Sequence, residues 1–137
     1  MTVVLDASVL MAHFDPHDAH HDAATRLLIE MAGQALMAHP LTIAEVLVGP
    51  ARVNRAVERR QSLREMRVDV IDIDIDIDID IDIEAPIRLA ILRAQTGLRM
   101  PDCCVLDAAT SRHATLATFD DRLSLLSRAR CVPVQPT

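Results

Sequence analysis

Val3-Val4-Leu5-Asp6-Ala7-Ser8, near the start of the 137-residue chain, is the stretch from which the fold can be worked out. A short apolar run without alternation is typical of a strand buried on both faces of a parallel sheet. From its place near residue 1 we expect no preceding domain. Ligands of open α/β sheets bind beyond the carboxyl ends of the strands. We therefore expect Asp6 to lie at such an end and to begin a carboxylate metal site.

Apolar runs that fit strands alternate along the chain with segments of helical periodicity. The expected strands cover residues 3–5, 35–38, 68 onward, 115–119 and 131–134, and the expected helices cover 8–14, 19–31, 42–48, 51–66, 85–95, 100–113 and a short segment after 120. This alternation implies a mostly parallel central sheet flanked by helices, a three-layer α/β fold. The length predicts a single domain over residues 1–137.

The composition limits both the core and the classes of function. The chain has two Phe and neither Trp nor Tyr, so the core must be aliphatic, and aromatic platforms that stack single-stranded nucleic acid are not favoured. Three cysteines without zinc-like spacing indicate a reducing cytoplasm. We expect no signal peptide, because the first residues lack a charged region followed by an apolar stretch, and the sequence has no apolar run of membrane-spanning length.

Charge is distributed unevenly along the chain. Eight of the 20 acidic residues lie between Asp69 and Glu84, so the remaining twelve face 14 basic residues, all of them Arg. Six of these arginines belong to the helix expected at 51–66 or follow it directly: Arg52, Arg55, Arg59, Arg60, Arg64 and Arg67. They spread over about half of the helix circumference. Arg pairs well with phosphate, so contact with an RNA backbone is one interpretation of this helix.

Residues 72–83 are a low-complexity repeat of six Asp-Ile pairs within the run Val68–Ile83. Strict alternation is a half-buried strand pattern, but 16 residues at about 3.3 Å each would span roughly 53 Å. A domain of this size has a radius of gyration of only about 14 Å. We expect the first part to be a strand at a sheet edge, and the rest to project, bend or pair with another chain. Repeat expansion at a tolerant surface position is favoured over a metal-binding or partner-binding role.

Four acidic residues are expected at element ends on one edge of the sheet: Asp6, Glu45, Asp102 and Asp120. Carboxylates brought this close raise each other's pKa unless a cation lies among them. Oxygen ligands suit Mg²⁺ or Mn²⁺. Each acid also has a structural interpretation. Asp102 has the position of a helix cap, Thr42 and Glu45 have the spacing of a capping box, and Asp120 or Asp121 is placed to cap the last helix.

The pattern resembles the PIN domain, and within it the VapC-type toxin ribonucleases. The matching segments are Val4–Ser8, Leu41–Val46, Leu98–Leu106 and Ala117–Asp120. The resemblance implies a metal-dependent endoribonuclease that is a homodimer and is neutralised by a VapB-type antitoxin. It also implies that Asp6 and Asp102 bind the metal directly. Glu45 and Asp120 would complete the metal shell or orient water, and Ser8 and Thr118 would supply supporting hydroxyls. The Thr-x-Asp pattern favours Asp120 over Asp121.

The chemistry of such a site is hydrolysis of RNA phosphodiester bonds. A bound Mg²⁺ would lower the pKa of water and neutralise charge on the phosphate. The resemblance implies products with a 5′-phosphate and a 3′-hydroxyl. One alternative is a PIN nuclease of RNA processing or DNA, unrelated to toxin-antitoxin systems. Others are a response-regulator-like acidic pocket, which would require a Lys that this chain lacks, and a catalytically silent binding domain.

Two further groups of side chains are not assigned to the site. The histidines His13, His17, His20 and His21 occur beside Asp15, Asp18 and Asp22 in an expected turn and helix start, where such residues are ordinary. A specific zinc site there is not favoured. Asp107 lies five positions after Asp102, about 140° around the helix, and is therefore left out of the acidic set.

Overall fold

A parallel sheet forms the centre of the molecule in the computed structural model, which describes residues 1–71 and 84–137. Within these residues the five strands are β1 (Thr2–Leu5), β2 (Ala35–Ala38), β3 (Val68–Val70), β4 (Thr115–Ala117) and β5 (Val134–Gln135). Their order in the sheet is β3-β2-β1-β4-β5, and every pairing is parallel. The Asp-Ile pairs at 72–83 lie outside the described residues. The expected strand before them is β3, and it lies at a sheet edge as predicted.

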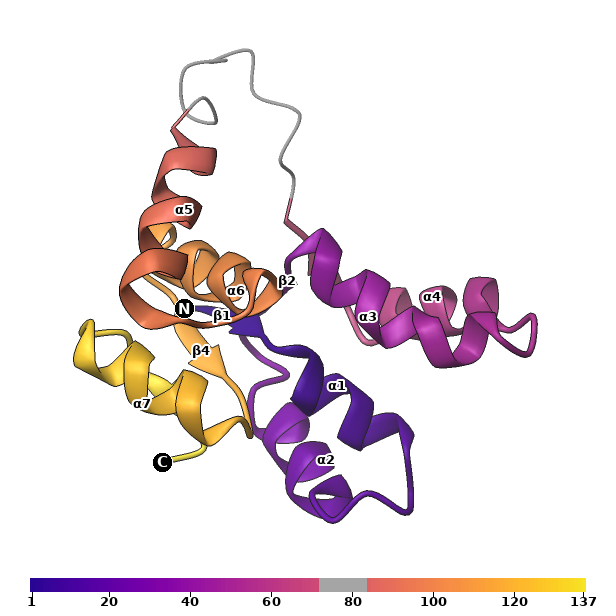
Figure 1. Ribbon diagram of the computed structural model, residues 1–137. Coiled ribbons are helices and arrows are strands. Elements are labelled where there is room, and N and C mark those ends of the chain that lie inside the picture. The colour runs from indigo at the N-terminus through magenta and orange to yellow at the C-terminus, as the bar shows by residue number, and fades with distance from the viewer. Residues whose placement is uncertain (72–83) are drawn as a thin grey trace.

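Helices cover both faces of this sheet, which confirms the predicted three-layer α/β fold (Figure 1). They are α1 (Ala7–Phe14), α2 (His21–Glu30), α3 (Pro40–Ala51), α4 (Ala56–Glu65), α5 (Ala85–Thr96), α6 (Met100–Ser111) and α7 (Asp121–Ala129). Successive strand residues point to opposite faces. Val3 and Leu5 of β1 accordingly pack with α1 to α4, whereas Val4 packs with α6 and α7. All three residues are fully buried, as the apolar run predicts.

The sheet order reverses at β1, whose neighbours are β2 on one side and β4 on the other. Ligands of open parallel sheets bind at such a switch point, beyond the carboxyl ends of the strands. Asp6 follows β1 directly, and its N–H donates to the carbonyl oxygen of Ala117, the last residue of β4, at 2.9 Å. The topology therefore places the ends of β1 and β4 side by side.

The largest differences from the predicted helix boundaries lie at the connection between α3 and α4. Gly49 and Pro50 do not end the helix before them, because Pro50 lies in the last turn of α3, which continues to Ala51. The helix expected over 51–66 begins only at Ala56. Asn54 adopts a left-handed φ of 58° in the connection. Asn tolerates that conformation because its short side chain can bond locally, so the chain turns here and α3 and α4 form a hairpin.

The outer face of α5 also carries apolar residues. Ile87 and Ile91 share one face of the helix and are 55% and 49% exposed. Leu89 and Leu92 pack instead against the core under α6. Gly97 ends the helix with a left-handed φ of 68°, as a C-terminal glycine should. In the part of the chain that the structure describes, no helix combines the length and hydropathy needed to cross a membrane.

Candidate active site

Asp6 is the centre of a hydrogen-bonded group at the ends of β1 and β4. The residue is 6% exposed, and its Oδ2 accepts hydrogen bonds from Ser8 Oγ at 2.7 Å and from Thr118 Oγ1 at 2.8 Å. Asp6 is also the residue before α1, but its side chain makes no capping bond there. A buried carboxylate is costly unless it is satisfied, and here two hydroxyls satisfy and orient it.

The same two hydroxyls fix the segment that follows β4. Thr118 Oγ1 accepts the backbone N–H of Asp120 at 3.0 Å, and Ser8 Oγ accepts the N–H of Phe119 at 3.0 Å. Each hydroxyl therefore donates to Asp6 and accepts from the segment between β4 and α7. The expected role of Ser8 and Thr118 as supporting hydroxyls agrees with these contacts.

The structure shows which of the other three acids act as helix caps. Thr42 and Glu45 do not form a capping box, because α3 begins at Pro40 and its cap is His39, whose Nδ1 accepts the N–H of Leu41. Asp102 lies in the first turn of α6, after the cap residue Arg99.

Asp120, by contrast, does cap a helix. Its Oδ1 accepts the N–H of Leu123 at 2.8 Å at the start of α7. Its neighbour Asp121 is exposed on the first turn of that helix. Because Asp120 also acts electrostatically on Asp102, it is the better member of the acidic set.

The four carboxylates are coupled electrostatically, because the charges of some of them act on the pKa of others. Burial raises the pKa of Glu45, and the negative charges of Asp6 and Asp102 raise it further. Burial likewise raises the pKa of Asp102, with further contributions from Asp6 and Asp120. The guanidinium of Arg99 opposes both shifts, and its Nε lies 3.6 Å from Asp102 Oδ2. These four acids are the site residues predicted from the sequence, and the fold brings them into one neighbourhood.

Carboxylate oxygens that repel one another suit a hard divalent cation. Mg²⁺ and Mn²⁺ prefer such oxygen ligands, and a cation would relieve the repulsion that raises the pKa of Glu45 and Asp102. Within residues 1–71 and 84–137, no three His, Cys, Asp or Glu side chains are close enough together to enclose an ion. The acids thus form an electrostatically coupled set without a closed cage, and the chemistry of the set fits a divalent metal.

Glu45→Gln is expected to weaken the pH dependence of stability in the metal-free protein. A raised pKa means that the folded state binds the proton more tightly than the unfolded chain. The free energy of unfolding contributed by Glu45 therefore decreases as the pH rises above the ordinary value of 4.5. Urea unfolding in EDTA between about pH 5 and 7 should show a smaller loss of stability for the variant than for the wild type. Glu30→Gln, on the exposed face of α2, is the control, and equal pH dependence in wild type and Glu45→Gln would refute the expectation.

Asp107, His13 and His21, which were left out of the predicted site, have structural partners. Asp107 pairs with Arg88 through two bonds, from Nε at 2.9 Å and Nη2 at 3.2 Å, and so joins α6 to α5. His13 Nδ1 lies 2.9 Å from Thr25 Oγ1, and His21 Nδ1 lies 2.9 Å from the carbonyl oxygen of Ala12. These contacts hold the α1–α2 hairpin together, in line with the structural interpretation of the histidines.

Sequence reasoning did not identify two features at this edge of the sheet. Arg99 is 73% exposed beside Asp102, and its spacing three residues before that acid was the available signal. The ring of His20 stacks on that of Phe119, between Thr118 and Asp120, and no local pattern relates these distant positions.

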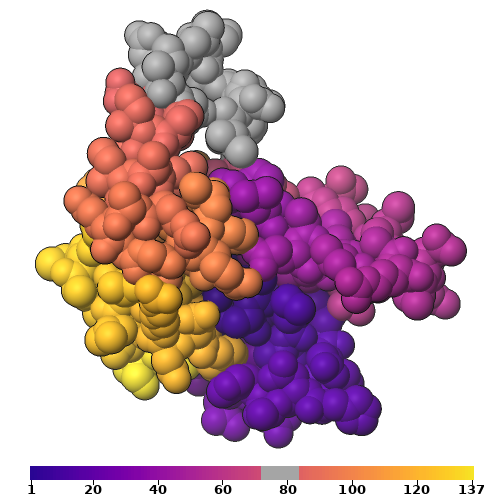
Figure 2. Space-filling view, in the orientation of Figure 1, coloured from indigo at the N-terminus to yellow at the C-terminus, as the bar shows by residue number. Residues whose placement is uncertain are grey.

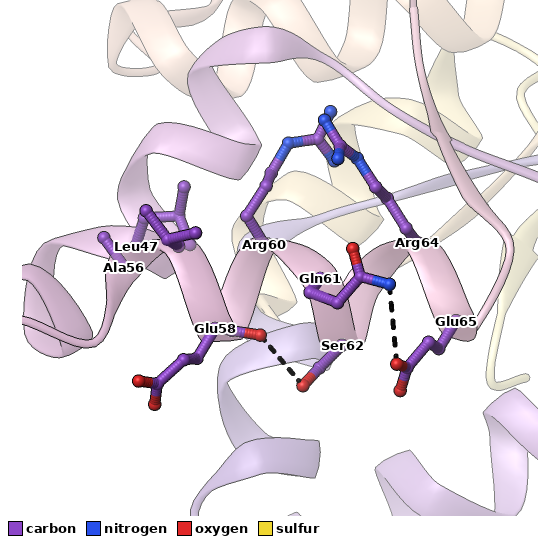
Figure 3. A pocket seen from close by; sticks show the side chains of 9 residues that line it. Leu47, Ala56, Glu58, Arg60, Gln61, Ser62, Arg64 and Glu65 are labelled. Atoms are coloured by element: carbon purple, nitrogen blue, oxygen red, sulfur yellow. Dashed lines mark hydrogen bonds between the residues drawn. The ribbon is translucent and has the colours of Figure 1, made fainter.

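A second surface feature is a groove between α3 and α4, a hairpin that projects from the body of the molecule (Figure 2). Leu47, Ala56 and Val57 give it an apolar side, and Arg60 and Arg64 line it as well. Figure 3 shows both arginine side chains extending from the same side of α4. Nη1 of Arg60 is buried and has no hydrogen-bond partner among the described residues. Glu58 and Glu65 also line the groove, which thus combines apolar surface with charges of both signs.

The fold and the site together define a class: parallel α/β domains with an acidic cluster at the switch point of the sheet. The model of the PIN domain family matches residues 3–129. The chain therefore belongs to the PIN domain family.

Solved structures share this fold at low sequence identity. VapC20 of Mycobacterium tuberculosis, a toxin that cleaves the sarcin-ricin loop, is 17% identical with a TM-score of 0.69, over 90% of this chain and 94% of that one. A toxin-antitoxin complex from Klebsiella pneumoniae is 20% identical with a TM-score of 0.67, over 86% of each chain. VapBC2 of Rickettsia felis, bound to a DNA fragment from its promoter, is 15% identical with a TM-score of 0.69, over 98% of each chain. No curated protein matches the chain.

Proposed function

We propose that this protein is a metal-dependent endoribonuclease, the toxin of a type II toxin-antitoxin pair, and that residues 1–137 form its single PIN domain. The observation that carries the proposal is the electrostatic coupling of Asp6, Glu45, Asp102 and Asp120 beyond the ends of β1 and β4. The fold shared with VapC20 and with two toxin-antitoxin complexes supports the same function. The site of action is the cytoplasm.

The side chains of the site have different roles at the scissile phosphate. Asp6 and Asp102 would hold Mg²⁺ or Mn²⁺, which would supply positive charge for the phosphate and lower the pKa of water. Ser8 and Thr118 keep the Asp6 carboxylate in one orientation. Glu45, whose pKa is raised, is suited to orient the attacking water and accept its proton. Asp120 completes the acidic shell while its carboxylate caps α7. In-line attack leaves a 5′-phosphate and a 3′-hydroxyl.

Arg99, the arginine beside the acids, binds the RNA backbone. Arg99 is largely exposed and already lies beside Asp102, so its guanidinium can pair with a phosphate next to the scissile bond. Such contacts make cleavage sensitive to salt, because counterions are released when phosphates are neutralised.

The antitoxin partner binds in the groove between α3 and α4. A segment with apolar and acidic side chains would cover Leu47 and Val57 and neutralise Arg60 and Arg64. Nη1 of Arg60 is buried and has no hydrogen-bond partner within residues 1–71 and 84–137, which supports an acceptor from a partner, since a buried donor without a bond is costly. The lining is apolar with charges of both signs, since Glu58 and Glu65 accompany Arg60 and Arg64, and this mixture favours a protein partner over RNA at this place. The exposed Ile87 and Ile91 of α5 support a homodimer.

Incubation of total RNA with the purified protein tests the proposed function. Cleavage is expected in the presence of Mg²⁺ or Mn²⁺ and not in EDTA, and mapping of the ends should find 5′-phosphates at a limited number of sites. A parallel reaction with DNA separates this function from that of a PIN nuclease with a DNA substrate. Intact RNA after incubation with folded, metal-supplied protein, or cleavage that survives EDTA, would contradict the proposal.

A further inference from the structure

One of the two phenylalanines in this aromatic-poor chain lies at the edge of the candidate active site. Phe119 follows Thr118 and precedes Asp120, and its N–H donates to Ser8 Oγ at 3.0 Å. The imidazole of His20 lies on its ring with 4.7 Å between the ring centroids and 6° between the ring planes. The backbone that carries the inner ring of this aromatic pair therefore bonds directly to a hydroxyl that holds Asp6.

The two rings differ in their environment. Phe119 is partly buried and packs against the hydrophobic core on the α1–α4 side of the sheet. His20 is exposed, and its backbone is fixed because its N–H donates to Asp18 Oδ1 at 2.7 Å. The core anchors the inner ring, the turn before α2 positions the outer ring, and the outer ring faces solvent. The pair is thus a small, rigid, outward-facing aromatic surface.

We propose that a nucleobase adjacent to the scissile phosphate stacks on His20, with Phe119 supporting the imidazole from behind. The inference rests on the proposed ribonuclease function and names the part of the RNA that the site grips besides its phosphates. Unstacked bases of single-stranded RNA bind to aromatic rings, including His, and the contact tolerates any base. The composition argues against a broad stacking platform, but a single pair at the site is enough to hold one base. His20 is then a positioning residue that acts on the substrate and not on the metal.

Binding of single-stranded RNA in EDTA tests the inference without cleavage. The probes are a fluorescently labelled ten-nucleotide RNA of mixed sequence and an abasic ribose-phosphate strand of equal length, with binding followed by anisotropy. The wild type is expected to prefer the base-bearing strand. His20→Ala should weaken binding of that strand by about five- to tenfold and leave binding of the abasic strand unchanged.

Two variants of the same turn serve as controls for His20→Ala. His20→Phe keeps an aromatic ring in place and should retain the preference for the base-bearing strand. His17→Ala removes another exposed histidine of this turn. The backbone N–H of His17 donates to Asp15 Oδ1 at 2.9 Å, just as the N–H of His20 donates to Asp18 Oδ1. Unlike His20, His17 stacks on no ring among the described residues. The His17→Ala variant should bind both strands as the wild type does.

Several results would overturn the inference. One is equal binding of both strands by the wild type. Another is a His20→Ala variant that keeps the full preference for the base-bearing strand, or that binds both strands more weakly by the same factor. A lower unfolding temperature with the preference intact would show that the stack only fixes the turn. Cleavage in Mg²⁺ is measured separately, so a wild type that prefers the base-bearing strand but cuts no RNA would contradict the proposed function and leave the stacking contact standing.

Discussion

Asp6→Asn is expected to reduce metal-dependent RNA cleavage by at least about 100-fold while the fold is retained. The variant keeps an oxygen that can accept the hydroxyls of Ser8 and Thr118, which bond to Asp6 Oδ2 in the wild type. It loses the negative charge that would bind the cation. Supporting groups of metal sites already contribute about 10- to 100-fold, so loss of a direct ligand should exceed that range. Cleavage of total RNA in Mg²⁺, with both proteins at equal concentration, is the measurement.

Thermal unfolding separates loss of the site from loss of the fold. Mg²⁺ should raise the unfolding temperature of the wild type and leave that of Asp6→Asn unchanged, because a ligand stabilises only the state that binds it. In EDTA the variant should be at least as stable as the wild type, since the charge that raises the pKa of Glu45 and Asp102 is gone. Asp121→Asn, one residue from Asp120 and exposed, is the control and should cleave normally. Normal cleavage by Asp6→Asn would remove Asp6 from the site.

Thr118→Val is expected to lower the cleavage rate by about 10- to 100-fold through the orientation of Asp6. Valine has nearly the shape of threonine but no hydroxyl. The change removes the 2.8 Å bond to Asp6 Oδ2 and leaves the N–H of Asp120 without its 3.0 Å acceptor. Thr118 is 3% exposed, so water cannot easily replace the lost bonds, and stability should fall by about 1–3 kcal/mol. Single-turnover cleavage and urea unfolding measure the two effects.

Thr118→Ser restores the hydroxyl and should recover most of the activity. Thr110→Val is the matched control, because Thr110 Oγ1 donates only to the carbonyl oxygen of Leu106 within α6, away from the site. If Thr118→Val cleaved as fast as Thr110→Val, the hydroxyl bridge would have no part in catalysis. Equal activity losses in Thr118→Val and Thr118→Ser would instead trace the effect to packing.

Much of the fold could be predicted because its signals are local. A continuous apolar run such as Val3–Leu5 has to be buried on both sides, and alternating strands and helices of this length favour a parallel sheet. The boundary between α3 and α4 could not be predicted in the same way. Arginine is a good helix former, so Arg52 and Arg55 continue the expected helix across residues 52–55, whereas packing of the hairpin imposes a left-handed turn at Asn54.

The candidate site was predictable to the extent that each acid stands at an element end. Asp6 was the clearest, because an acid directly after a buried strand requires a partner. Glu45 was harder to predict, since its spacing from Thr42 imitates a capping box that the structure replaces with a cap at His39.

The α5 face with Ile87 and Ile91 is apolar by sequence, yet it is exposed because Leu89 and Leu92 face the core.

The sequence by itself determined the strands, the aliphatic core and the acids at the strand and helix ends, since these depend on residue type and short-range periodicity. The tertiary structure alone decided which of these groups meet. The order β3-β2-β1-β4-β5 brings Thr118 to Asp6 and Phe119 to Ser8, and it lets His20 stack on Phe119. Strand order results from the packing of distant segments into one core, and no local spacing records it.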